Sequence, residues 1–201
     1  MISNCIFDFG QVIVHFLPRE LTRPYVNNEE DLDLVTAVAF DRLYWNRLDQ
    51  GTISDAEILA AFRTRLPERL WDAAEQAYLR SIGNLTPLDG MPELLRDLKK
   101  AGKKLYLLSN ISTIFAQTYR NYPQLADVLA PFDGLVFSGP LHVTKPSPAI
   151  FNHLTDTYGL NKAESVFIDD NADNVAGAEA VGLPAYHFDG DVQKLRAFLL
   201  G

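Results

Sequence analysis

A single carboxylate, Asp8, interrupts an apolar run that spans residues 5–14. The run is rich in β-prone residues, so it predicts a central strand that ends in a turn at residues 8–11. Ligands of open α/β sheets bind in the crevice beyond the carboxyl ends of the strands. Asp8 is therefore the first candidate for chemistry, and the alternative is that it only caps the turn.

Further strand ends along the chain also carry polar side chains. They are Ser109 and Asn110 after residues 105–108, Lys145 after residues 135–137, and Asp169 and Asp170 after residues 166–168. If the sheet is parallel, all of these side chains gather near Asp8 at one edge. A carboxylate nucleophile, a hydroxyl, a lysine and an acidic pair form a coherent set for catalysis.

The elements that must position these side chains follow a regular alternation after residue 86. The pattern predicts helices at 92–100, 113–119 and 149–158 and a last helix ending at residue 182, alternating with strands at 105–108, 135–137, 166–168 and 185–187. Such alternation indicates a mainly parallel sheet with helices on both faces. We therefore expect an α/β fold with a Rossmann-like three-layer core.

A helical stretch follows the first strand. Apolar residues recur at helical spacing from Leu32 to Ala39, and Ser54 and Glu57 form a capping box that starts a second helix. A third helix is expected at residues 71–82, with Ala74, Tyr78 and Leu79 on its inner face. We expect a small helical cap domain at residues 16–85 and a core made of residues 1–15 and 86–201.

Composition limits the partners. The 201 residues are 47% hydrophobic, which suits a globular protein, and carry 18 basic against 26 acidic residues. The net charge of -8 argues against nucleic acid and anionic membranes as partners. Cys5 is the single cysteine, and no apolar run approaches the ~20 residues of a membrane helix, so we expect a cytoplasmic protein. The sequence carries no signal for a particular oligomeric state.

The order and type of the polar strand ends resemble the haloacid dehalogenase superfamily over nearly the whole chain. Asp8 is similar to the nucleophile of that superfamily, Ser109 to its second motif, Lys145 to its third, and Asp169 and Asp170 to its acidic fourth. The helical insert resembles the cap of the subgroup whose cap lies between the first two motifs. The resemblance implies a phosphatase-like hydrolase that forms an aspartyl-phosphate on Asp8.

The same resemblance implies the binding roles. Mg²⁺ would be held by Asp8, Asp170 and the backbone carbonyl of Gly10, with Asp169 either a further ligand or an acceptor that orients a metal-bound water. Lys145, the Ser109 hydroxyl and the amides of Asn110 and Ile111 would bind the phosphoryl oxygens. Asn174 stands where many relatives have an acid that supports the metal site.

Gly10 departs from the pattern, because most phosphatases of the superfamily have a second aspartate there. That aspartate protonates the leaving group, and such help is worth about 10²- to 10⁴-fold in rate. A subset with glycine still resembles sugar-phosphate phosphatases. The sequence therefore favours a Mg²⁺-dependent phosphatase of small phosphorylated metabolites, and above all a sugar 1-phosphate, whose anomeric leaving oxygen needs less protonation.

Alternatives remain at this stage. His15 could replace the missing acid, or it could be a hinge contact. Carbon–halogen hydrolysis of a 2-haloacid also proceeds without the second aspartate, although dehalogenases resemble one another in having tyrosine there and a serine–asparagine pair in place of Asp169 and Asp170. A paired acid suits Mg²⁺ and would repel a substrate carboxylate. A non-catalytic phosphate-binding module is the third reading.

Substrate contacts are expected in the cap at residues 40–46, which mix aromatic and polar side chains. Arg42, Trp45 and Asn46 are the candidates, and the alternative is a solvated helix face with a packed aromatic side. Hinges are expected near residues 14–16 and 85–87. His142, His153 and His187 show no spacing that would indicate a zinc site.

Overall fold

The computed structural model describes residues 2–201 and has a parallel sheet at its centre. Five strands pair in the order β5-β4-β1-β6-β7, and every pair is parallel. Their bounds are β1 (Asn4–Phe7), β4 (Lys104–Ser109), β5 (Gly134–Phe137), β6 (Ser165–Asp169) and β7 (Ala185–His187). Because β1 is the middle strand, Asp8 lies at the centre of the carboxyl edge, and its amide donates to the Ile168 carbonyl at 2.8 Å.

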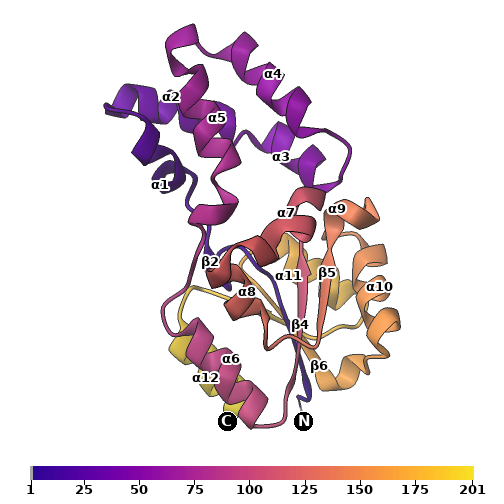
Figure 1. Ribbon diagram of the computed structural model, residues 1–201. Helices are drawn as coiled ribbons and strands as arrows, with labels where there is room; N and C mark the ends of the chain where they lie inside the picture. Colours follow the sequence, from indigo (N-terminus) through magenta and orange to yellow (C-terminus); the bar gives the residue numbers. More distant parts are fainter. Residues whose placement is uncertain (1) are drawn as a thin grey trace.

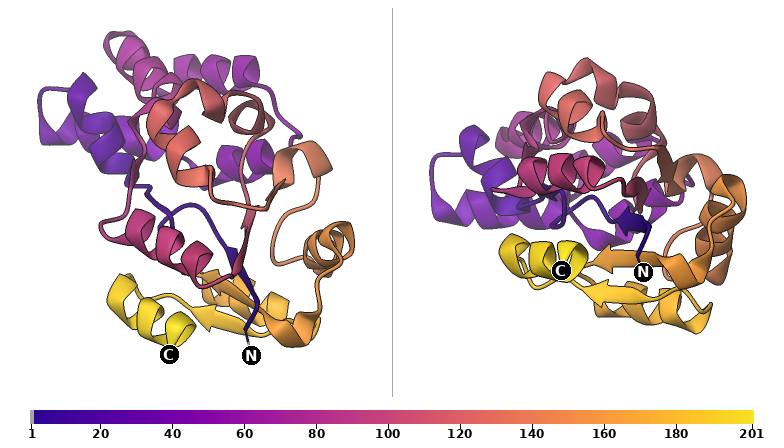
Figure 2. Two further views of the ribbon diagram at one scale, coloured as in Figure 1. Left: turned by 60° about the horizontal axis from the view of Figure 1, so that its bottom comes forward. Right: turned by 90° about the horizontal axis from the view of Figure 1, so that it is seen from below.

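Helices cover both faces of this sheet (Figures 1 and 2). Cys5 and Phe7 of β1 belong to an apolar cluster with helices on one face, whereas Ile6 packs in a second cluster on the other face, as the alternation of a strand requires. The first face carries α6 (Met91–Lys100), α7 (Thr113–Thr118), α8 (Pro123–Leu129) and α12 (Val192–Leu200); the second carries α10 (Pro148–Tyr158) and α11 (Ala172–Ala180). The predicted three-layer α/β fold is confirmed.

A group of helices stands over the carboxyl edge, at the top of Figure 1. It contains α1 (Pro18–Thr22), α2 (Glu29–Ala39), α3 (Arg42–Asp49), α4 (Asp55–Arg65) and α5 (Trp71–Leu79). The group has an apolar cluster of its own, and the capping box of Ser54 and Glu57 is present at the start of α4. The assignment of residues 16–85 to a cap and of residues 1–15 and 86–201 to a core stays a prediction.

Two short strands join the helical group to the sheet. They are β2 (Val14–His15) and β3 (Thr86–Pro87), which pair antiparallel. Gln11 tightens the turn before β2: its backbone has a φ of 60°, and its side chain accepts a hydrogen bond from the Phe16 amide at 2.8 Å. The chain therefore leaves the sheet and returns to it at neighbouring points.

The sequence pattern missed several short elements. These are α1, β2, β3, α8, the single turn α9 (Ser138–Leu141) and α12, and most of them are too short to show a period. The prediction of Leu79 on an inner face was wrong, because α5 ends at that residue and the residue is 47% exposed. Within residues 2–201, no helix combines the length and apolarity needed to cross a membrane.

Candidate active site

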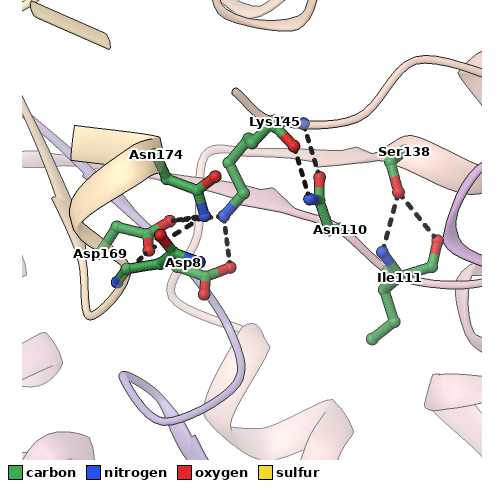
Figure 3. A network of polar contacts seen from close by, with 8 residues as sticks. Asp8, Asn110, Ile111, Ser138, Lys145, Asp169 and Asn174 are labelled. Atoms are coloured by element: carbon green, nitrogen blue, oxygen red, sulfur yellow. Dashed lines mark hydrogen bonds and ion pairs between the residues drawn. The ribbon is translucent and has the colours of Figure 1, made fainter. Parts of the chain in front are cut away.

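Lys145 joins two carboxylates at the carboxyl edge of the sheet (Figure 3). Its Nζ donates to Asp8 Oδ1 at 2.6 Å and to Asp169 Oδ2 at 2.7 Å. The lysine and Asp169 side chains are almost completely buried, and that of Asp8 is 13% exposed. The structure thus brings together side chains from the ends of β1 and β6 and from the loop before α10.

The electrostatics of this cluster are unbalanced. Burial raises the pKa of Asp8 to about 7, with the charge of Asp169 acting in the same direction and the attraction of Lys145 opposing it. Burial disfavours the charged lysine, but the two carboxylates outweigh it and keep the pKa of Lys145 above its usual value. Desolvation and the charge of Asp169 also raise the pKa of Asp170. One cation therefore faces an excess of negative charge.

A divalent cation fits this excess. Carboxylate oxygens of Asp8, Asp169 and Asp170 lie within 4.8 Å of one another, and the backbone of Gly10 lines the same cavity. Hard oxygen ligands of this kind are those that Mg²⁺ prefers. The residues present at this edge of the sheet are compatible with the predicted magnesium site.

Asp169 is held more firmly than its neighbours. Asn174 donates its side-chain amide to both oxygens of Asp169, at 3.2 and 3.1 Å, and the Asn171 amide donates to Oδ1 at 2.8 Å. Together with Lys145 these contacts occupy both oxygens of the carboxylate (Figure 3). The carboxylate oxygens of Asp8 and Asp170 are therefore more available to a ligand than those of Asp169.

The loop after β4 lines the cavity and also holds the backbone of Lys145. Ser109 is buried at the strand end and lines the cavity. The Asn110 side chain accepts from the Lys145 amide at 2.8 Å and donates to the Lys145 carbonyl at 3.0 Å, so it fixes the lysine's backbone. The Ile111 amide donates to Ser138 Oγ at 2.9 Å. The Ile111 amide is thus bonded within the protein, and its use for phosphate stays a prediction.

A cavity of about 660 Å³ opens above these residues, between the sheet and the helical group. The predicted cap residues Arg42, Trp45 and Asn46 line it from α3. Trp45 is anchored, because its Nε1 donates to the Ala39 carbonyl at 2.8 Å and its ring stacks on Phe40 with centroids 5.3 Å apart. The structure therefore brings α3 over the carboxylate cluster.

His15 does not reach this cavity. In the two-residue strand β2, Val14 is buried and His15 points to the exposed side, opposite Thr86. It lines a separate depression with Leu17 and Pro24. Of the two alternatives for His15, this placement favours the hinge contact over a role as acid, because side chains alternate between the two sides of β2.

The sequence reasoning missed Ser138 and Asp49. Ser138 is fully buried, and its Oγ donates to the Asp49 carbonyl at 2.6 Å while accepting from the Ile111 amide. Ser138 follows β5 directly, so the rule that found Ser109 could also have found it. Asp49 ends α3, lines the cavity and carried no comparable local signal.

Ser138→Ala tests this bridge between the sheet and α3. Loss of the hydroxyl leaves the Asp49 carbonyl and the Ile111 amide unpaired, so we expect the free energy of unfolding to fall by about 1–3 kcal/mol and KM to rise. Urea denaturation and steady-state kinetics measure both. Ser165→Ala is the matched control: this buried serine donates to Asn161 at 2.7 Å and accepts from Asn4, within the core alone. Equal changes of KM in the two variants would contradict the bridge.

The family model for haloacid dehalogenase-like hydrolases matches residues 4–182, and the chain belongs to this family. It is therefore a hydrolase with the fold and the carboxylate cluster described above.

Relatives with different substrates are similar to this chain. It is 27% identical over 183 residues to the sesquiterpene phosphatase astK of Aspergillus oryzae. That match covers 90% of this chain and 87% of the relative. It is 26% identical over 196 residues to the D-ribitol-5-phosphate phosphatase of Bacteroides thetaiotaomicron, with 92% and 91% covered. The (S)-2-haloacid dehalogenase of Pseudomonas sp. (strain YL) is 33% identical over 108 residues, with 54% and 44% covered.

Among solved structures, the HAD family enzyme bt-2542 of Bacteroides thetaiotaomicron, in complex with magnesium and inorganic phosphate, superposes with a TM-score of 0.69. It is 23% identical and the match covers 97% of this chain and 99% of that one. At this identity the similarity concerns the fold.

Proposed function

We propose that the protein is a Mg²⁺-dependent phosphatase of small phosphate esters. The observation that carries the proposal is the cluster of Asp8, Asp169 and Asp170 around one buried lysine, at the floor of a ligand-sized cavity. The negative excess suits a divalent cation, and Lys145 beside Asp8 suits the oxygens of a phosphoryl group. The carboxylate of a 2-haloacid substrate would instead be repelled by the acidic pair of Asp169 and Asp170.

In this mechanism the Asp8 carboxylate attacks phosphorus and the bond from phosphorus to the ester oxygen breaks, which gives an aspartyl-phosphate. Lys145 and the Ser109 hydroxyl bind the phosphoryl oxygens and stabilise the charge that develops on them. Asp8, Asp170 and the Gly10 carbonyl would hold Mg²⁺, whose charge would reduce the repulsion between the Asp8 carboxylate and the phosphate ester. Asp169, fixed by Asn174 and Lys145, orients a water near the site. Water then attacks phosphorus and frees Asp8.

The substrate we propose is a sugar phosphate. The polar side chains of Arg42 and Asn46 beside the flat ring of Trp45 suit a hydroxylated molecule, which stacks and accepts hydrogen bonds at once. With Gly10 the core offers no acid near the leaving group, which favours the 1-phosphate. One relative acts on D-ribitol 5-phosphate and another on a sesquiterpene phosphate, as their names state, so a panel must include both classes. The cytoplasmic location stays a prediction.

Dehalogenation is the second candidate, because the dehalogenase relative is the more identical over its matched part. In that reaction Asp8 would displace halide from carbon without a metal. The acidic pair opposes it, since Asp170 would face the substrate carboxylate. A non-catalytic phosphate-binding module would form the aspartyl-phosphate and fail to release it.

A substrate panel tests the proposal. We expect phosphate release from sugar phosphates with Mg²⁺, loss of at least about 10²-fold in chelator because the carboxylate cluster then repels the substrate, and recovery on adding Mg²⁺. Colorimetric phosphate release from glucose 1-phosphate, glucose 6-phosphate and ribitol 5-phosphate measures this. Halide release from 2-chloropropionate that persists in chelator would instead establish the dehalogenase. A stable phosphoenzyme without turnover would establish the binding module.

A further inference from the structure

Among residues 2–201, the titratable side chains that the core contributes to the cavity are Asp8, Lys145 and Asp170, and each already has another role. Asp8 is the nucleophile, Asp170 belongs to the metal cluster, and Lys145 is bonded to two carboxylates. Gly10 is not enforced by crowding, because the nearest atom to a Cβ built there would be Phe16 Cβ at 3.7 Å. An alkyl leaving oxygen must nevertheless receive a proton, so the donor has to come from elsewhere.

The helical group reaches the core at the carboxyl end of α3. Asp49 accepts a hydrogen bond at its backbone carbonyl from Ser138 at 2.6 Å, and the Gln50 carbonyl lies 3.0 Å from His142 Nδ1. Gly51 has a φ of 64°, and a Cβ on it would lie 2.4 Å from the Gly139 carbonyl oxygen. Only glycine permits this close approach. The contacts fix residues 49–51 against the sheet.

This docking brings the Asp49 carboxyl into the cavity that holds Asp8, Gly10 and Lys145. Among residues 2–201, no hydrogen bond or ion pair engages the Asp49 carboxyl. Asp55, the other carboxyl that α3 to α5 contribute to the cavity, accepts a hydrogen bond from the Tyr78 hydroxyl. Of the two carboxyls that the helical group contributes to the cavity, Asp49 is therefore the one that is free to act on a ligand.

The surroundings of Asp49 suit proton exchange near neutral pH. Burial raises its pKa to about 7, the charge of Asp8 adds to this, and the charges of Lys145 and Arg42 oppose it. The charge of Asp49 also acts on Tyr78 of α5, whose pKa is raised by burial and by the hydrogen bond to Asp55, so Tyr78 stays neutral. A carboxyl with such a pKa can serve as acid and then as base.

We propose that Asp49 is the general acid and base of the reaction and replaces the side chain that Gly10 lacks, an inference that rests on the proposed phosphatase function. As Asp8 attacks, the electron pair of the breaking bond between phosphorus and the ester oxygen stays on that oxygen, which takes the proton from the Asp49 carboxyl. In the second step, the Asp49 carboxylate takes a proton from the attacking water. The bond between phosphorus and Asp8 breaks, and both carboxyl groups return to their starting forms.

Asp49→Asn tests the inference through the leaving group. Asparagine keeps the shape and cannot donate this proton, so kcat/KM should fall about 10²- to 10⁴-fold on alkyl esters such as glucose 6-phosphate. The phenolate of an aryl ester such as p-nitrophenyl phosphate leaves without protonation. The fall in kcat/KM on this ester should therefore stay below about 10-fold. Asp49→Glu, which keeps the acid, should recover part of the alkyl activity. Asp55→Asn is the matched control and should leave the ratio of alkyl to aryl rates unchanged.

A second measurement follows the carboxyl without substrate. The folded pKa of Asp49 lies above its unfolded value, so the neutral form stabilises the fold at low pH and this contribution disappears as pH rises from about 4 to 7. Asp49→Asn should therefore gain stability relative to wild type over that interval in urea denaturation, and a constant difference would contradict a free carboxyl in the cavity.

The outcomes separate the two proposals. If wild type hydrolyses both esters and Asp49→Asn lowers kcat/KM equally on the alkyl and the aryl ester, or lowers neither, the assignment of Asp49 fails while the phosphatase stands. If wild type with Mg²⁺ hydrolyses no phosphate ester, the proposed function fails and the role of Asp49 with it.

Discussion

Asp8→Asn is expected to abolish phosphate-ester hydrolysis on every substrate, by at least about 10⁴-fold in kcat. The amide is nearly isosteric with the carboxylate but is uncharged and a poor nucleophile, so no aspartyl-phosphate can form. The fold should persist, because Lys145 retains its hydrogen bond to Asp169 at 2.7 Å. Phosphate release and trapping of the labelled phosphoenzyme at low pH measure the effect.

The control for Asp8→Asn is Asp156→Asn. Asp156 lies on the exposed surface of α10, away from the carboxyl edge. Its substitution by asparagine removes the same negative charge as Asp8→Asn. It should retain full activity. An Asp8→Asn protein that hydrolyses any ester at a tenth of the wild-type rate would contradict the nucleophile assignment, and a loss in both variants would indicate a general effect of charge.

Lys145→Met is expected to damage both stability and activity. Methionine has a similar length but leaves Asp8 and Asp169 buried without their cation, and breaking such a pair costs about 3–5 kcal/mol. The phosphoryl oxygens also lose their charged donor, which should lower kcat/KM by about 10²- to 10³-fold. Urea denaturation and steady-state kinetics measure the two effects.

Lys100→Met is the control for this variant. Lys100 is 76% exposed and pairs with Asp97 within one helix, so its loss should change the free energy of unfolding by less than about 0.5 kcal/mol. If Lys145→Met were as stable as Lys100→Met, the ion pairs at the carboxyl edge would not hold the loop before α10. Unchanged kinetics would remove Lys145 from phosphate binding.

The local sequence pattern was sufficient to predict the site residues that stand at the ends of strands. Asp8, Ser109 and Asp169 each come at the end of an apolar run, and parallel pairing brings such ends to one edge. The same reasoning placed Lys145 nearby, because it follows β5 closely in the sequence, after the single turn α9. It did not predict that the lysine would bridge two acids, since that depends on side-chain direction.

Contacts between distant segments were beyond local pattern. Ser138 bonds to Asp49 across 89 positions of sequence, and no periodicity within either segment encodes that meeting. The exposure of His15 depends on which residue of a two-residue strand faces inward, a choice set by the pairing of β2 with β3. The region with the weakest sequence signal therefore contains Asp49, the residue we assign to proton transfer.

The antiparallel pairing of β2 with β3 also bears on how such an enzyme can diversify. Because the chain leaves and re-enters the sheet through two adjacent strands, both chain connections of the intervening segment lie at a single seam. Recombination at that seam would exchange the whole segment and leave the strand order β5-β4-β1-β6-β7 intact. The exchanged segment would carry Asp49 with it, so the proposed substrate contacts and proton transfer would be inherited together, separately from the proposed phosphoryl chemistry of the sheet.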